Sequence, residues 1–213
     1  MGATSDQTPF WDAAAAAKRF THPLDHGRFT TLVARDARIL DYGCGQGRLC
    51  GELVAQGFTG LLGVDTSAEM IRLARERNPG VEFTLLDAAR LPCADASIDA
   101  VLLFAVLTCI PAPEAQRALI AELRRVLRPD GLLVPSDYPL QSDARNLERY
   151  ATFAHEPTGY GTFRLPDGAV LRHHRREWFD ELLSQFRIEG QTEFEARTMN
   201  GNPARILQLW GRR

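Results

Sequence analysis

The sequence lacks several features that would place it in a specialised class of protein. Its 25 basic and 27 acidic residues nearly balance, so the net charge is only −2. No bulk positive field is therefore available to attract nucleic acid. The longest apolar run, residues 101–110, is too short to cross a bilayer and is typical of a buried strand. The chain does not open with a basic segment and an apolar stretch, so we expect no secretory signal and a cytoplasmic location.

Cysteine is also scarce, and its spacing excludes the common paired arrangements. The four cysteines, at positions 44, 50, 93 and 109, form no C-x-x-C pair. We therefore expect buried free thiols in a reducing cytosol and no metal site. With 213 residues, 45% of them hydrophobic, the chain is long enough to bury one α/β core, and we expect a single domain over 1–213.

The most informative feature that is present is a glycine-rich turn within residues 39–49. Apolar residues lead into Asp41, glycines follow at positions 43, 45 and 47, and an amphipathic stretch begins at Leu49. This order predicts a buried strand, a tight turn and a helix start, where backbone N–H groups can approach a ligand closely. Arg48 stands where the dinucleotide fingerprint G-x-G-x-x-G has its third glycine. The spacing therefore argues against a simple NAD site.

Strand-like and helix-like segments then alternate along the chain. Strands are predicted at 38–41, 60–65, 81–86, 98–104 and 132–137, with helices between most of them and further helices at 9–20 and near 147–154. This alternation predicts a doubly wound parallel sheet. The pattern breaks over 138–172, a long irregular segment of the kind that forms binding loops. A helix at 175–185 and two strand-like runs, 187–196 and 204–210, close the chain, and the short link between those runs favours an antiparallel hairpin.

Candidate ligand-binding residues follow the predicted strands at their carboxyl ends, where open parallel sheets bind ligands. Asp65 ends the second strand and can accept hydrogen bonds from two ribose hydroxyls. Asp87 and Ala88 end the third strand, where the carboxylate can receive an adenine amino group. Residues 104–108 follow the fourth strand and can cover the base or the reacting group.

Together these motifs resemble the class I S-adenosylmethionine (SAM)-dependent methyltransferases of the small-molecule type. The matching segments are 40–47, 63–67, 87–92, 97–99 and 127–133. The resemblance implies a Rossmann-like, doubly wound, seven-stranded α/β sheet, mostly parallel with one antiparallel C-terminal strand and helices on both faces. It implies SAM as cofactor and S-adenosylhomocysteine as product. The implied cofactor-binding residues are Asp41, Gly43, Cys44, Gly45, Gly47, Asp65, Thr66, Met70, Asp87, Ala88 and Phe104.

Residues that select the methyl acceptor are expected outside the shared segments. We expect 1–35 to form an N-terminal helical lid and 138–174 an acceptor-side insertion. His22, Asp137 and His173 are candidate catalytic residues, with structural packing as the more common role for such histidines. His173 and His174 are adjacent, and on an extended chain their side chains point in opposite directions, so they do not form a metal pair.

Three functions remain open at this point. The first is methyl transfer to a small molecule at O, N, S or C, by an in-line displacement that needs alignment more than a base. The second is a SAM- or S-adenosylhomocysteine-binding protein with a regulatory or other role, and the third, disfavoured by Arg48, is an NAD-type oxidoreductase. The segment after the fourth strand lacks the Asn/Asp-Pro-Pro-aromatic motif of enzymes that methylate bases. We therefore expect a small-molecule partner, no nucleic acid or membrane, and a monomer or homodimer.

Overall fold

The computed structural model describes residues 7–87, 90–155 and 158–213, and its centre is one seven-stranded sheet. The strands run in the spatial order β3-β2-β1-β4-β5-β9-β8. Their bounds are β1 Arg38–Tyr42, β2 Gly60–Asp65, β3 Glu82–Leu85, β4 Ile98–Phe104, β5 Leu127–Asp137, β8 Arg187–Arg197 and β9 Pro203–Arg212. The five strands from β1 to β5 pair in parallel, whereas β9 is antiparallel to both β5 and β8. The predicted fold class, including its one antiparallel strand, is confirmed.

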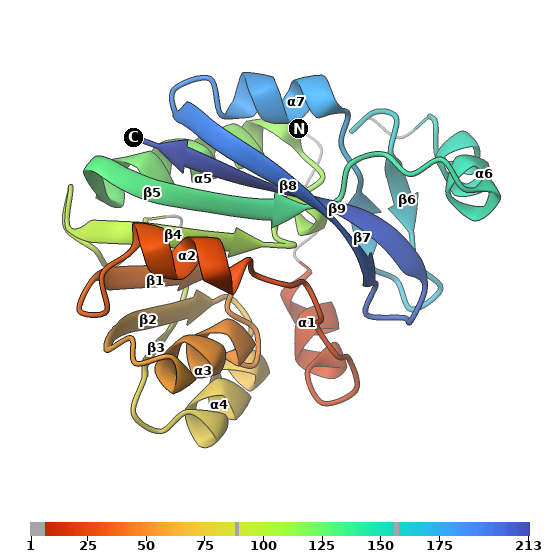
Figure 1. Ribbon diagram of the computed structural model, residues 1–213. Helices are drawn as coiled ribbons and strands as arrows, with labels where there is room; N and C mark the ends of the chain where they lie inside the picture. Colours follow the sequence, from red (N-terminus) through yellow and green to blue (C-terminus); the bar gives the residue numbers. More distant parts are fainter. Residues whose placement is uncertain (1–6, 88–89, 156–157) are drawn as a thin grey trace.

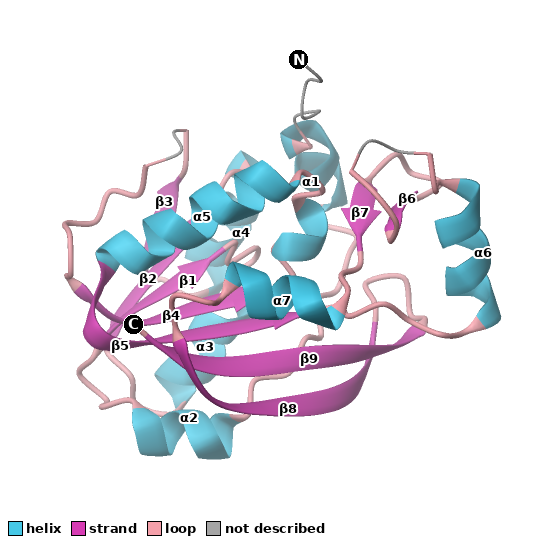
Figure 2. Ribbon diagram, turned by 90° about the horizontal axis from the view of Figure 1, so that it is seen from above, coloured by secondary structure: helices cyan, strands magenta, loops and turns pink. Residues whose placement is uncertain are grey.

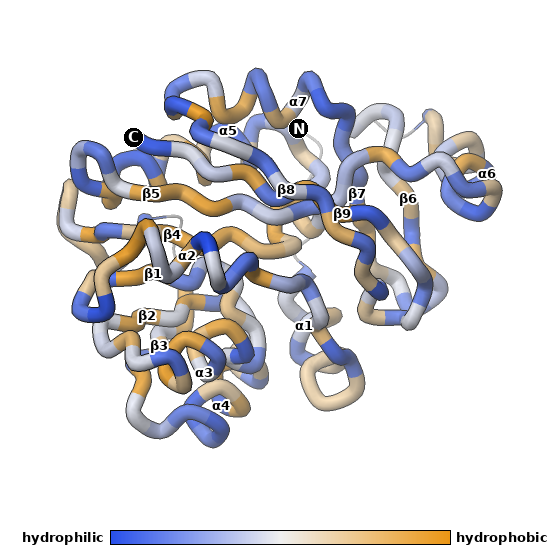
Figure 3. Tube along the Cα trace, in the orientation of Figure 1, coloured by the Kyte–Doolittle hydropathy of each residue, from blue (hydrophilic) through white to orange (hydrophobic). Residues whose placement is uncertain are grey.

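Helices cover both faces of this sheet, as Figures 1 and 2 show. One face carries α2 (His26–Leu32), α3 (Arg48–Ala55) and α4 (Ala68–Arg77), and the other carries α5 (Pro113–Val126) and α7 (Arg176–Leu182). The side chains of β4 alternate between them: Val101 and Leu103 join the core under α5 and α7, while Leu102 joins the core under α2 and α3. Because both faces are covered, β4 is apolar apart from Asp99 near its start, and Figure 3 shows the contrast between this hydrophobic strand and the more polar edge strand β8.

The segment after β5 forms a small substructure beyond the carboxyl ends of the strands. It contains α6 (Ala144–Thr152) and a two-stranded hairpin of β6 (Thr162–Arg164) and β7 (Val170–Arg172). The first helix, α1 (Thr8–Ala14), lies at the same end of the sheet (Figure 1). A helix near 147–154 is predicted by the sequence, but strands of three residues are too short to show an alternating pattern. The predicted helix over 9–20 ends early, at Ala14, and β5 begins at Leu127 rather than 132.

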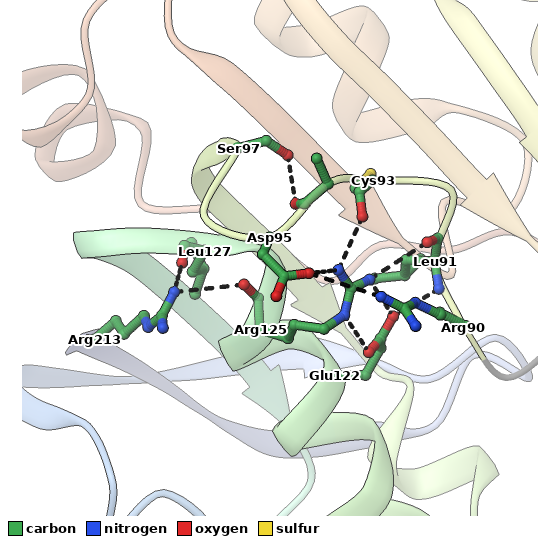
Figure 4. A network of polar contacts seen from close by, with 10 residues as sticks. Arg90, Leu91, Cys93, Asp95, Ser97, Glu122, Arg125, Leu127 and Arg213 are labelled. Atoms are coloured by element: carbon green, nitrogen blue, oxygen red, sulfur yellow. Dashed lines mark hydrogen bonds and ion pairs between the residues drawn. The ribbon is translucent and has the colours of Figure 1, made fainter.

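The loop between β3 and β4 is fixed to α5 by a network centred on Arg125 (Figure 4). The Arg125 guanidinium donates to the carbonyl oxygen of Cys93 at 3.0 Å and pairs with Asp95 at 2.5 Å and Glu122 at 2.6 Å. Glu122 also accepts the backbone N–H of Leu91 at 2.7 Å. Arg125 and Glu122 of α5 therefore hold residues 91–95 of this loop in place.

A short 3-10 helix, η1 (Leu107–Cys109), follows β4. Among the described residues, no helix is both long and apolar enough to cross a membrane, and no three His, Cys, Asp or Glu side chains are grouped to hold a metal ion.

Candidate active site

A cavity of about 1790 Å³ opens at the carboxyl ends of the parallel strands. We call its two sides the donor half, lined by the turns that follow β1, β2 and β4, and the acceptor half, lined by residues within 138–173 and 197–202. Eight of the predicted cofactor-binding residues line the cavity: Asp41, Gly43, Cys44, Gly45, Asp65, Thr66, Met70 and Phe104. The predicted catalytic candidates His22 and His173 line it as well. The sheet topology therefore brings together residues that are far apart in sequence.

The glycine turn adopts a backbone that other residues strongly disfavour. Gly43, Gly45 and Gly47 all have positive φ, of 71°, 52° and 75°. A Cβ on Gly43 would lie 2.5 Å from Cγ2 of Val106, whereas a Cβ on Gly45 would meet nothing closer than 3.9 Å. Gly45 thus leaves open space toward the cavity, as close approach of a ligand to the backbone requires.

Asp65 is held at the edge of this turn by backbone donors. Its Oδ2 accepts the N–H of Gly45 and its Oδ1 accepts the N–H of Ser67, both at 2.9 Å. Each carboxylate oxygen can accept a further hydrogen bond. The positioned carboxylate could accept hydrogen bonds from a ribose diol, and its role toward SAM stays a prediction. Burial raises its pKa above the usual value, and the backbone hydrogen bonds oppose that rise.

Asp41 is more deeply placed than Asp65. Its side chain is buried, and burial raises its pKa to about 7, against the opposing effect of a hydrogen bond from the Cys50 thiol at 3.5 Å. A nearby Arg48 also favours the charged form. A buried carboxyl beside the glycine turn fits a cationic ligand group such as the ammonium of the methionine part of SAM.

The remaining predicted cofactor-binding residues do not line the cavity. Gly47 is buried at the start of α3, where a Cβ would lie 2.9 Å from Phe83. Asp87 is exposed and, within the described part of the chain, is not among the cavity residues. Its role toward adenine stays a prediction. Ala88 lies outside the described residues.

The N-terminal segment covers the donor half. The Asp12 carboxylate of α1 accepts the hydroxyl of Ser67 at 2.5 Å and the N–H of Glu69 at 3.2 Å, which fixes α1 to the start of α4. Further along, Lys18 bonds Asp167 at 2.9 Å and Asn200 at 2.6 Å. The segment therefore ties the donor half to the insertion and to the turn between β8 and β9.

His22 lies between the two halves of the cavity. Its ring packs edge-on against Phe104, at 6.2 Å between centroids, and against Tyr138 at 4.9 Å. Its Nε2 is buried without a hydrogen-bond partner among the described residues, and burial lowers its pKa to about 3. His22 is therefore neutral at physiological pH and a weak base.

His173 is buried in the acceptor half and is bound by a tyrosine. Its Nδ1 lies 2.5 Å from the hydroxyl of Tyr150, and its ring stacks on Tyr138 at 5.1 Å between centroids. Burial lowers its pKa well below the usual value. Its neighbour His174 lies outside the cavity, against Phe179, so the two histidines point apart as the sequence predicts.

Asp137 does not match its predicted position facing the acceptor. It is fully buried, and its carboxylate accepts the N–H of Tyr138 at 2.7 Å and of Thr108 at 3.1 Å. Burial raises its pKa to about 7. Within the described residues it does not line the cavity, so its observed contacts hold the turn after β4 in place.

Arginines of the insertion are the main feature that the sequence reasoning missed. Arg145 and Arg149 lie on α6 and line the acceptor half. Their spacing of four residues places them on one face of the helix. The four-residue spacing can be seen in the sequence and indicates a shared helix face. It does not show that this face of α6 points toward the cavity.

Comparisons with known proteins agree with this geometry. Residues 39–131 match a family model described as a methyltransferase domain. The chain is 36% identical over 127 residues to a trans-aconitate 2-methyltransferase from Methylobacterium nodulans, covering 58% of this chain and 48% of that protein. It is 39% identical over 106 residues to a malonyl-[acyl-carrier protein] O-methyltransferase from Methylococcus capsulatus, covering 48% of this chain and 38% of that protein. The chain thus spans less than half the length of these curated relatives.

A solved structure extends the similarity over almost the whole chain. It is a SAM-dependent methyltransferase from Methanosarcina mazei, 25% identical, with a TM-score of 0.82, and the match covers 88% of this chain and 97% of that one. The family match includes the glycine turn, and the solved structure shares the fold over most of the chain. The domain match, the curated relatives and the shared fold together support a class I SAM-dependent methyltransferase.

Proposed function

We propose that this chain transfers the methyl group of SAM to a small organic acceptor bound in the acceptor half. SAM would supply a methyl group on a sulfonium, whose transfer leaves a neutral thioether. One observation carries the proposal: a single cavity joins the glycine turn and Asp65 to the surface formed by the insertion. The curated relatives support it, because the names of several state small-molecule or carrier-bound acceptors.

In this proposal each half of the cavity has its own task. Asp65 and the backbone of the glycine turn orient the donor, and the N-terminal segment 1–35 acts as the lid. The insertion 138–174 orients the acceptor, and the surrounding rings exclude water. His22 and His173 have lowered pKa values, so an acceptor that needs no strong base suits the site best. The whole chain would act as one domain, in the cytoplasm, as a monomer or homodimer and without nucleic acid or membrane partners.

The proposal is tested by binding and by transfer of a labelled methyl group. We expect calorimetry to show saturable binding of S-adenosylhomocysteine and none of NAD. We also expect label from methyl-tritiated SAM to enter a small-molecule fraction of a cell extract. Binding of NAD in preference to S-adenosylhomocysteine would reject the cofactor assignment. Tight binding of S-adenosylhomocysteine with no label transfer to any acceptor would reject methyl transfer and favour a regulatory SAM-binding role.

A further inference from the structure

Arginines outnumber carboxylates among the described residues of the acceptor half. Four arginines line it: Arg145, Arg149, Arg164 and Arg197. Among the described residues of this half, Asp167 is the acidic lining residue, and it is paired with Lys18 at 2.9 Å. Glu114 also lines the cavity, but it is exposed at the start of α5. The charge of this lining therefore favours an anionic ligand over a cationic one.

Arg149 is the most constrained of these arginines. Its guanidinium carbon lies 3.5 Å from the ring centroid of Phe163, and its Nε is buried without a hydrogen-bond partner among the described residues. Burial lowers its pKa to about 10, so it remains charged at physiological pH. No ion pair joins it to a carboxylate within the described ranges; the Asp143 carboxylate caps α6 by accepting the N–H of Asn146 and lies 3.8 Å from Arg145. The charged Arg149 guanidinium is thus partly removed from water where it packs on Phe163. This desolvation costs free energy, and a bound anion would offset that cost.

The hydrogen bonds around Tyr150 define which nitrogen of His173 carries the proton. The Tyr150 hydroxyl accepts the backbone N–H of Gln141 at 3.2 Å. Nδ1 of His173 is the acceptor that lies within reach of the hydroxyl's own hydrogen among the described residues, so the hydroxyl donates to it. Because the ring is neutral, the remaining proton lies on Nε2, which bonds no described residue. His173 is therefore a hydrogen-bond donor in the cavity rather than a base.

We propose that the methyl acceptor carries a carboxylate that binds Arg149, with Nε2–H of His173 as a second donor. Phe163 fixes the plane of the guanidinium, and a planar fork of N–H groups matches a carboxylate. This inference rests on the proposed function, since it names the acceptor of that reaction.

The carboxylate of the cofactor's own methionine part is the other possible source of such an anion, and the position of the site favours the acceptor. A chain of ring contacts leads from Phe104 in the donor half through His22 and Tyr138 to His173, with centroids 6.2, 4.9 and 5.1 Å apart in turn. Arg149 and His173 both belong to the insertion and line the acceptor half, whereas the glycine turn lines the donor half.

The test compares acids with their neutral counterparts. Benzoate, phenylacetate and tricarballylate, each beside its primary amide, are titrated into the protein saturated with S-adenosylhomocysteine, and binding is followed by ligand-observed NMR. We expect at least one acid to bind at least tenfold more tightly than its amide. Arg149→Gln should remove that preference, and Arg149→Lys should restore part of it. Equal binding of acids and amides, binding of no acid, or an unchanged preference in Arg149→Gln would overturn the proposal.

Two controls separate this proposal from its alternatives. The first control is Arg35→Gln. Arg35 also packs on a ring, that of Phe58 at 4.5 Å, but it lies outside the cavity, so this variant should change neither acid nor amide binding.

The second control measures binding of S-adenosylhomocysteine and of 5′-methylthioadenosine, which lacks the amino-acid part, to Arg149→Gln. A loss confined to S-adenosylhomocysteine would assign the anion to the cofactor and overturn the proposal. Methyl transfer to neutral acceptors, independent of Arg149, would also overturn it while leaving the proposed function intact.

Discussion

The two halves of the cavity are built from different kinds of structure. The donor half consists of turns that follow parallel strands directly, and main-chain bonds hold them: the N–H groups of Gly43 and Cys44 both donate to the carbonyl oxygen of Val64, at 2.8 and 3.0 Å. The acceptor half consists of side chains from an added substructure, held by long-range contacts such as those of Gln7 with Val170. Donor binding thus depends on backbone geometry, and acceptor binding on individual side chains.

The largest effect is expected where backbone geometry is disturbed. Gly43→Ala places a Cβ 2.5 Å from Val106 at a φ of 71°, so the turn must move. We expect affinity for S-adenosylhomocysteine, measured by calorimetry, to fall about 100-fold, or about 2.8 kcal/mol. Gly57→Ala is the matched control, because Gly57 has a φ of 86° and a Cβ added there would meet no atom within 4 Å. It should lower stability by about 1–2 kcal/mol and leave affinity unchanged. Affinity within threefold of the parent for Gly43→Ala would contradict the backbone account.

A side-chain change in the donor half should have a smaller effect. Asp65→Ala removes the predicted ribose acceptor and leaves the N–H groups of Gly45 and Ser67 unpaired. We expect a loss of about 1–2 kcal/mol in binding of S-adenosylhomocysteine. Asp99→Ala is the control, since Asp99 also accepts a backbone N–H, from Arg38 at 2.7 Å, but lies at the opposite end of the sheet. An unchanged affinity in Asp65→Ala would show that this carboxylate does not bind the cofactor.

The buried Asp41 makes the donor half sensitive to pH. Its pKa is raised from 3.8 to about 7, so the ligand-free folded protein binds this proton more tightly than the unfolded chain does. Its contribution to stability is complete below about pH 4 and is lost as pH rises through about 7. Asp41→Asn should therefore gain unfolding free energy relative to the parent as pH rises from 4 to 8, because its amide carries no charge to bury. Denaturant titrations across this range measure the difference, and a pH-independent difference would contradict it.

The same contrast explains how much the sequence could predict. Donor-half residues such as Gly43 and Asp65 lie at the carboxyl ends of neighbouring parallel strands. The alternation of strands and helices in the sequence predicts such a sheet, and so predicts that these residues lie close together. The exposure of Asp87 and the burial of Asp137 were not predictable, because each depends on how a loop packs.

The acceptor half shows the limit more clearly. The pairing of Tyr150 with His173 spans 23 positions, and Arg149 on α6 meets Phe163 on β6. Neither contact has a sequence signature, because β6 and β7 have only three residues each and show no periodicity. The sequence could therefore predict the cofactor. The positive charge and the hydrogen-bond donors of the acceptor surface become visible only in the three-dimensional structure.

The smallest predicted effect concerns the protonation of His173. Tyr150→Phe keeps the buried ring but removes the hydroxyl that donates to Nδ1. In the parent, nitrogen-15 NMR of labelled histidine should show the Nε2–H form alone, and in the variant both neutral forms. Binding of the acid probes should weaken about two- to fivefold, as expected for one neutral hydrogen bond of about 0.5–1 kcal/mol. Tyr160→Phe, an exposed ring 5.5 Å from that of Tyr150, should change neither signal. An Nδ1–H form in the parent would make Nε2 an acceptor, and His173 would then favour a protonated or neutral methyl acceptor instead of a carboxylate.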